Sequence, residues 1–133
     1  MNLTDVLAQI LESARTLVGA SHSGLGVIGP DGEFSEFVHS DDPAAFSHDP
    51  IGPDTIRQAT REAKPRRVAP PEAMLCVPVV VDGTAVGALC LACPADGTEF
   101  TARDEDIAIA LAQSAGRAIE NTALLTEARR RQD

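Results

Sequence analysis

Apolar residues near the start of the chain recur at the three- and four-residue spacing that puts them on one face of a helix. The positions are Leu3, Val6, Leu7, Ile10, Leu11, Ala14, Leu17 and Val18. Asn2 stands where a side chain can cap the first turn, and Gly19 can adopt the left-handed conformation that ends a helix. The pattern therefore predicts a helix from about residue 3 to residue 18.

The next two apolar stretches, residues 24–28 and 33–39, flank the turn sequence Pro30-Asp31-Gly32. An Asp-Gly pair between apolar stretches is a strong hairpin signal, so two antiparallel strands are expected here. Residues 40–52 contain three aspartates, two prolines and no periodicity, and they predict an exposed loop.

A second Asp-Gly pair, Asp82-Gly83, lies between residues 74–81 and 84–93. Both stretches are rich in valine, leucine and cysteine and carry almost no charge, which predicts the central strands of a sheet. A short strand near residues 66–69 would bring the number of strands to five.

Two more helices are predicted further along the chain. A short one covers residues 53–63, with a proline at its start and another just after its end. A long one begins after Thr101, whose hydroxyl can cap it, with Asp104 in the capping-box position. Small and apolar residues share its faces, and residues 121–133 are expected to begin a linker helix.

The predicted elements follow the order helix, hairpin, loop, short helix, hairpin and long helix. This order is typical of an α+β domain with an antiparallel sheet. Four stretches resemble a GAF domain, and they cover most of the chain. They are LVGASHSGLGVIGPDG (17–32), AKPRRV (63–68), MLCVPVVVDGTAVGALCLA (74–92) and FTARDEDIAIALAQSAGRAIENTALL (100–125). The resemblance implies a PAS- or profilin-like sheet of five to six strands, with the N- and C-terminal helices on one face and a ligand pocket on the other.

The segments FVHSDDP and IENTALLTEARRRQ resemble, more particularly, GAF domains of redox- and oxygen-sensing histidine kinases of the dormancy type. Family members bind cyclic nucleotides, haem, bilins or small metabolites, and many only dimerise and transmit helix motion, so the fold does not name a ligand. In the family a long segment closes the pocket before the Val-Pro strand, whereas only residues 69–73 remain here. Haem-binding relatives take their axial histidine from that segment, and no histidine follows His48. The resemblance thus implies a reduced pocket and argues against haem.

Composition restricts the class of protein further. The 133 residues, 44% hydrophobic and 23% charged, suit one globular domain. A net charge of −9, no tryptophan and no tyrosine argue against nucleic-acid binding. No apolar run is long enough to cross a bilayer, and no export signal is recognised, so we expect a cytoplasmic domain without a membrane partner.

The three cysteines are the first candidates for chemistry. Cys90 and Cys93 form a C-x-x-C motif, but on a predicted strand, where positions three apart point to opposite faces unless a bulge intervenes. In the free methionine sulfoxide reductases, an enzymatic branch of the GAF family, the cysteines precede the Val-Pro strand, where this chain has none. We therefore expect buried packing thiols and no enzyme; a thiol-based redox enzyme of that type is an alternative.

The acidic loop is the second candidate. His39, Asp41, Asp42, His48 and Asp49 contain metal-ligand types without a recognised ligand spacing, so a solvated loop and no metal site are expected. Ser47, His48 and Asp49 are consecutive and cannot readily converge into a catalytic triad.

These observations predict a signalling sensor and dimerisation module that relays a change through its C-terminal helix to an output domain such as a histidine kinase. A homodimer is expected, with relay or interface positions at Leu7, Leu11, Ala115, Ile119, Leu124 and Leu125. The alternative is a receptor with a compact pocket for haem, a nucleotide or a metabolite. Its expected contacts are Phe37, His39, Phe46, His48, Ile56, Met74 and Cys76. A sheet face covered by the chain's own loop and short helix is an equal alternative to such a pocket.

Overall fold

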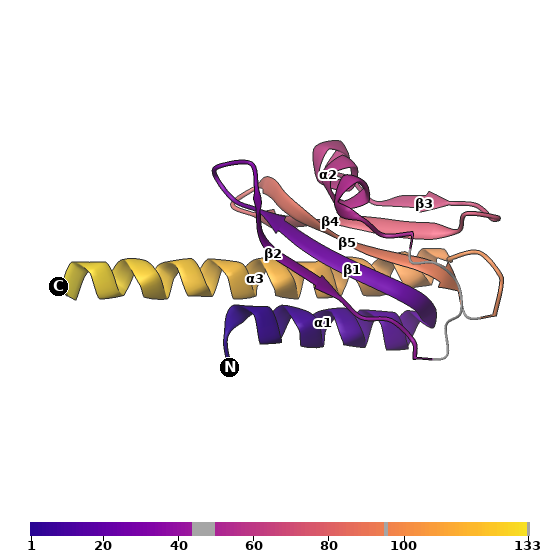
Figure 1. Cartoon of the computed structure of the whole chain (residues 1–133), viewed down its shortest axis with the longest axis horizontal. Coiled ribbons are helices and arrows are strands. Elements are labelled where there is room, and N and C mark those ends of the chain that lie inside the picture. Colours follow the sequence, from indigo (N-terminus) through magenta and orange to yellow (C-terminus); the bar gives the residue numbers. More distant parts are fainter. Residues whose placement is uncertain (44–49, 95, 133) are drawn as a thin grey trace.

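The computed structural model describes residues 1–43, 50–94 and 96–132, with side chains described up to residue 123. A five-stranded antiparallel sheet lies between two helical layers (Figure 1). Helices α1 and α3 pack side by side on one face, and helix α2 lies on the opposite face. The predicted α+β fold is confirmed, with the N- and C-terminal helices on the same face.

Helix α1 spans Leu3–Val18, as its apolar spacing predicts. The Asn2 side-chain oxygen accepts a hydrogen bond from the Asp5 amide at 2.9 Å, which satisfies one of the unpaired donors of the first turn. Gly19 ends the helix with φ +80°, and its amide donates to the carbonyl of Arg15 at 2.8 Å.

Helix α3 spans Ala102–Gln132 and begins with the predicted capping box. The Thr101 hydroxyl accepts from the Asp104 amide at 3.1 Å, and the Asp104 carboxylate accepts from the Thr101 amide at 2.9 Å. The helix runs antiparallel to α1, and its C-terminal half extends past the sheet and past the start of α1 (Figure 1). Among the described residues, no helix has both the length and the apolar character required to cross a bilayer.

The strands lie in the order β2-β1-β5-β4-β3. Their bounds are Ala20–Ile28 for β1, Phe34–His39 for β2, Arg66–Val68 for β3, Met74–Val81 for β4 and Thr84–Pro94 for β5. Strand β1 begins four residues earlier than predicted, because Ala20 and His22 pair with the end of β5 rather than with the hairpin partner β2. Hairpin signals report only local pairing, so this extension was missed.

Helix α2 spans Pro53–Glu62 and ends at Ala63, which adopts a left-handed conformation with φ +55°. Its apolar face packs on β5, β1 and β4. The sheet therefore has two apolar layers. The larger one, between the sheet and helices α1 and α3, is centred on Leu7, Leu11, Leu25, Leu75 and Leu91. The smaller one, beneath α2, contains Ile51, Ile56, Ala59, Cys76, Ala88, Cys90 and Ala92.

Candidate functional site

The middle of the sheet face beneath α2 is filled by the chain itself. Gly24 and Gly26 of β1 present no side chain there, and Ile51 and Ile56 lie directly on them. A Cβ at Gly24 would come within 2.6 Å of Ile51 Cγ2, and one at Gly26 within 2.8 Å of Ile56 Cγ2. Because both isoleucines are at most 2% exposed, they close the part of this face where a large ligand would otherwise fit.

A cavity of about 270 Å³ remains beside this filled region, between α2 and the β3 edge of the sheet. It is lined by Thr55, Gln58, Ala59, Glu62, Arg66, Val68, Glu72, Met74 and Cys76. The volume lies just below the range of about 300–1,000 Å³ typical of small-molecule sites. We call this space the β3 cavity.

The β3 cavity has a polar rim and an apolar wall. Arg66 Nη1 lies 2.8 Å from Glu62 Oε1, and Gln58 Nε2 donates to the same oxygen at 3.2 Å. Met74 and Cys76 supply the apolar wall. The Arg66 side chain is half exposed, so its ion pair with Glu62 stabilises the fold little and its guanidinium remains open to solvent.

The sequence-predicted ligand residues divide into three groups. Met74 and Cys76 line the β3 cavity. Ile56 fills the sheet face instead of lining the cavity, while Phe37 and His39 lie together on β2 with ring centroids 4.9 Å apart. Phe46 and His48 lie outside the described residues. The lining from α2 and β3 was missed, although the alternation along AKPRRV could have suggested that Arg66 and Val68 share one face.

Strand β3 connects this cavity to helix α3. Arg66 and Val68 line the cavity, whereas Arg67, between them, belongs to the other face of the strand. Arg67 Nε lies 3.2 Å from Glu105 Oε1 in the first turn of α3, and Arg67 Nη1 donates to the Phe100 carbonyl at 3.5 Å. The ion pair and the hydrogen bond of Arg67 thus connect β3 with the start of α3.

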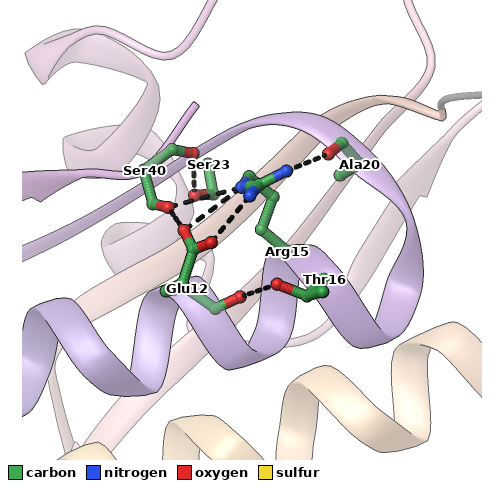
Figure 2. A network of polar contacts seen from close by, with 6 residues as sticks. All are labelled: Glu12, Arg15, Thr16, Ala20, Ser23 and Ser40. Carbon is green, nitrogen blue, oxygen red and sulfur yellow. Dashed lines mark hydrogen bonds and ion pairs between the residues drawn. The ribbon is translucent and has the colours of Figure 1, made fainter. Parts of the chain in front are cut away.

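A polar network ties the end of β2 to helix α1 (Figure 2). Arg15 is largely buried; it donates to Glu12 at 2.7 Å, to the Ser40 hydroxyl at 3.3 Å and to the Ala20 carbonyl at 3.3 Å. Ser40 in turn donates to Glu12, and its carbonyl accepts from the Ser23 hydroxyl at 2.5 Å. This network fixes the first residue of the loop after β2 against α1, and sequence patterns gave no signal for it.

A buried histidine lies close to the same loop. His22 is 3% exposed, and its Nδ1 lies 3.0 Å from Asp41 Oδ1, a partially exposed carboxylate. His39 and Asp41, both considered as metal-ligand types, do not gather with a third such group within the described residues. Asp49 and His48 of the acidic loop lie outside those residues.

The two cysteines that lie opposite each other in the sheet are not the two of the C-x-x-C motif. Cys76 of β4 pairs with Cys90 of β5 across the ladder, and both belong to the apolar layer beneath α2. Cys93 has φ +56° and packs at the margin of the same layer. A hydrogen bond with Cys76, reinforced by burial, raises the pKa of the Cys90 thiol well above its ordinary value. The opposite-face expectation for Cys90 and Cys93 is therefore wrong, because the positive φ turns the Cys93 side chain.

The proposed relay positions lie mostly inside the protomer. Leu7, Leu11 and Ala115 are completely buried between α1, α3 and the sheet. Their dimer or relay roles stay predictions. Ile119 is partly buried against the same core, and the side chains of Leu124 and Leu125 lie outside the description.

A family model for the GAF domain matches residues 2–119. The chain belongs to the GAF family. GAF domains are sensor modules of signalling proteins, and in general they are not catalytic. The resemblance derived from the four sequence stretches is thus confirmed at the level of the family.

Solved GAF structures have the same fold at low sequence identity. The third GAF domain of Slr1393 from Synechocystis sp. PCC6803, in its photoproduct state, has a TM-score of 0.75 and 18% identity, covering 95% of this chain and 98% of that one. The second GAF domain of DevS from Mycobacterium smegmatis has a TM-score of 0.66 and 20% identity, covering 99% of this chain and 100% of that one. A GAF domain/HD domain protein from Geobacter sulfurreducens has a TM-score of 0.67 and 22% identity, covering 92% of this chain and 96% of that one.

Proposed function

We propose that this GAF domain is a sensor and dimerisation module that converts a change at the β3 cavity into a change in helix α3. In this proposal α3 leads to an output domain, such as that of a histidine kinase, in a larger cytoplasmic signalling protein. The observation that carries the proposal is the double role of β3. One face of this short edge strand lines the cavity, and Arg67 on the other face pairs with Glu105 of α3.

The length of α3 supports the direction of the relay. The helix has 31 residues, whereas the sheet and α1 cover only its first part (Figure 1). The C-terminal part of α3 extends past the sheet and past the start of α1, and it carries Leu124 and Leu125. Two copies of such a helix can bury these residues against each other as a helical bundle.

The second candidate function is a receptor for a small molecule, and the β3 cavity favours it. Its volume of about 270 Å³ suits a compact metabolite better than a large planar cofactor. A guanidinium, two carboxylates and an amide on its lining offer donors and acceptors together. Native mass spectrometry of the purified protein separates the two candidates, since a bound compound adds mass that denaturation removes.

The dimer is tested by replacing Leu124 and Leu125 with aspartate and measuring self-association by analytical ultracentrifugation. We expect the wild type to be a dimer and the double variant a monomer, because two charges per chain would have to be buried at the helical interface. Lys64→Asp is a charge-matched control. It also changes the net charge by two negative units, but at an exposed position 60 residues before Leu124 in the sequence.

The control variant should sediment as the wild type does. A monomeric wild type, or a Leu124→Asp/Leu125→Asp variant that still dimerises, would show that the C-terminal part of α3 is not the contact between copies. The relay through β3 would then need a different output.

A further inference from the structure

Strand register brings two thiols together beneath helix α2. The Cys93 amide donates to the Ala73 carbonyl at 3.2 Å, so residues 73 and 93 form a hydrogen-bonded pair. Hydrogen-bonded and non-hydrogen-bonded pairs alternate along an antiparallel ladder. Cys76 and Cys90 lie three pairs further on from residues 73 and 93. They therefore occupy a non-hydrogen-bonded pair, where Cα atoms are about 4.5 Å apart and side chains are closest.

This separation matches a disulfide, whose Cα atoms lie about 4.4–6.8 Å apart. Cys93 does not fit in the same way. It is three residues from Cys90 along β5 and pairs opposite residue 73, which puts its Cα about 10 Å along the strands from those of Cys76 and Cys90 at a rise of about 3.3 Å per residue. The C-x-x-C spacing is thus unbridgeable without rearrangement, whereas the cross-strand pair needs only small movements.

One of the two thiols can be reached from outside. Cys76 is 8% exposed and lines the β3 cavity, whereas Cys90 is completely buried behind it. We propose that Cys76 and Cys90 form a reversible dithiol–disulfide site, oxidised by a peroxide that enters the β3 cavity.

The chemistry balances with hydrogen peroxide as the oxidant. The Cys76 sulfur attacks one peroxide oxygen, the O–O bond breaks, and Cys76 becomes a sulfenic acid while the other oxygen leaves as water. The Cys90 sulfur loses its proton and attacks Cys76 Sγ; the S–S bond forms, the S–O bond breaks, and a second water leaves. Two thiols lose two electrons and two protons, and the peroxide is reduced to two waters.

The second step depends on ionisation of the Cys90 thiol. In the reduced chain the hydrogen bond with Cys76 and burial raise the pKa of this thiol, and the burial remains once Cys76 is a sulfenic acid. Since the thiolate is the attacking form, bridging should be slow at neutral pH and should accelerate as the pH rises.

The test is to treat the reduced, folded chain with hydrogen peroxide, alkylate the remaining thiols and map the peptides. The stretch 68–102 has no lysine or arginine, so cleavage at Asp82 is used to separate Cys76 from the other two cysteines. We expect an intramolecular bridge across that cut, a loss of two hydrogen atoms from the intact mass, and reversal by dithiothreitol. Cys93→Ser should keep the bridge, and Cys76→Ser and Cys90→Ser should each abolish it.

Three results would overturn the proposal. These are a bridge that disappears in Cys93→Ser, a bridge between two chains, and oxidation that stops at a sulfinic acid on Cys76. The peptide map of the wild type decides between these outcomes even if Cys90→Ser folds poorly. Circular dichroism of each variant shows whether a variant that lacks the bridge is still folded. The outcome is independent of the dimer test, so either proposal can fail alone.

Discussion

On strand β1, Gly24 and Gly26 determine how closely the covering segment approaches the sheet. Because glycine has no side chain, Ile51 and Ile56 pack directly against the backbone of β1. These two isoleucines fill the space that a wider pocket would occupy. The prediction of a reduced pocket came from a short segment elsewhere in the chain. The effect of that segment on the pocket stays a prediction, whereas the close approach at the two glycines is revealed only by the three-dimensional packing.

Gly26→Ala should lower the free energy of unfolding by about 1–3 kcal/mol, the usual cost of overpacking. The new Cβ would lie 2.8 Å from Ile56 Cγ2 and 2.9 Å from Phe34 Cε1. Urea unfolding measures the loss, and Gly29→Ala is the control, because the nearest atom to a Cβ there is the Asp31 carboxylate oxygen at 3.3 Å. In the Gly26→Ala/Ile56→Ala double variant the combined cost should be smaller than the sum. Additive costs would mean that the two residues do not share this space.

At the scale of elements, periodicity and turn signals predicted the helices and strands, but register decided the site. The Asp82-Gly83 turn pairs Val81 with Thr84, and continuing that register would set Cys76 opposite residue 89, since each pair sums to 165. An irregularity between Val79 and Val80 shifts the ladder by one residue and sets Cys76 opposite Cys90. Gly87, opposite Val79, is the kind of isolated strand glycine that can mark a bulge or a close backbone approach. Because these two readings are not distinguished by the sequence, the shift and the thiol pair were not predicted.

The link from β3 to α3 gives a prediction about local dynamics. Arg67→Gln removes the ion pair with Glu105, and we expect backbone amides of β3 and of the first turn of α3 to exchange up to about five-fold faster. Arg66→Gln removes the pair with Glu62 instead and should leave α3 unchanged. Hydrogen exchange followed by mass spectrometry measures both. Unchanged exchange at the start of α3 in Arg67→Gln would contradict coupling through this residue.

At the scale of the whole molecule, composition makes alkaline titration informative. The chain has no tyrosine and a single lysine, Lys64, so few groups other than the three thiols titrate above neutral pH. In the folded chain the pKa of Cys90 is raised, while in the unfolded chain the thiol ionises at about 8.5. Above that pH the folded state holds a proton that the unfolded state has released. The contribution of Cys90 to stability is therefore complete below about pH 8 and is lost as the pH rises toward the folded pKa.

This reasoning predicts that the free energy of unfolding, measured in urea under reducing conditions, falls as the pH rises above about 8.5. One proton accounts for a slope of at most about 1.4 kcal/mol per pH unit. Cys90→Ala should flatten the slope, whatever its effect on stability at neutral pH, because the buried thiol is gone. Cys93→Ala, at the margin of the apolar layer, should preserve most of it. If both variants keep the wild-type slope, the hydrogen-bonded thiol pair does not govern the alkaline limit of this fold, and the sheet must lose stability through its exposed charges instead.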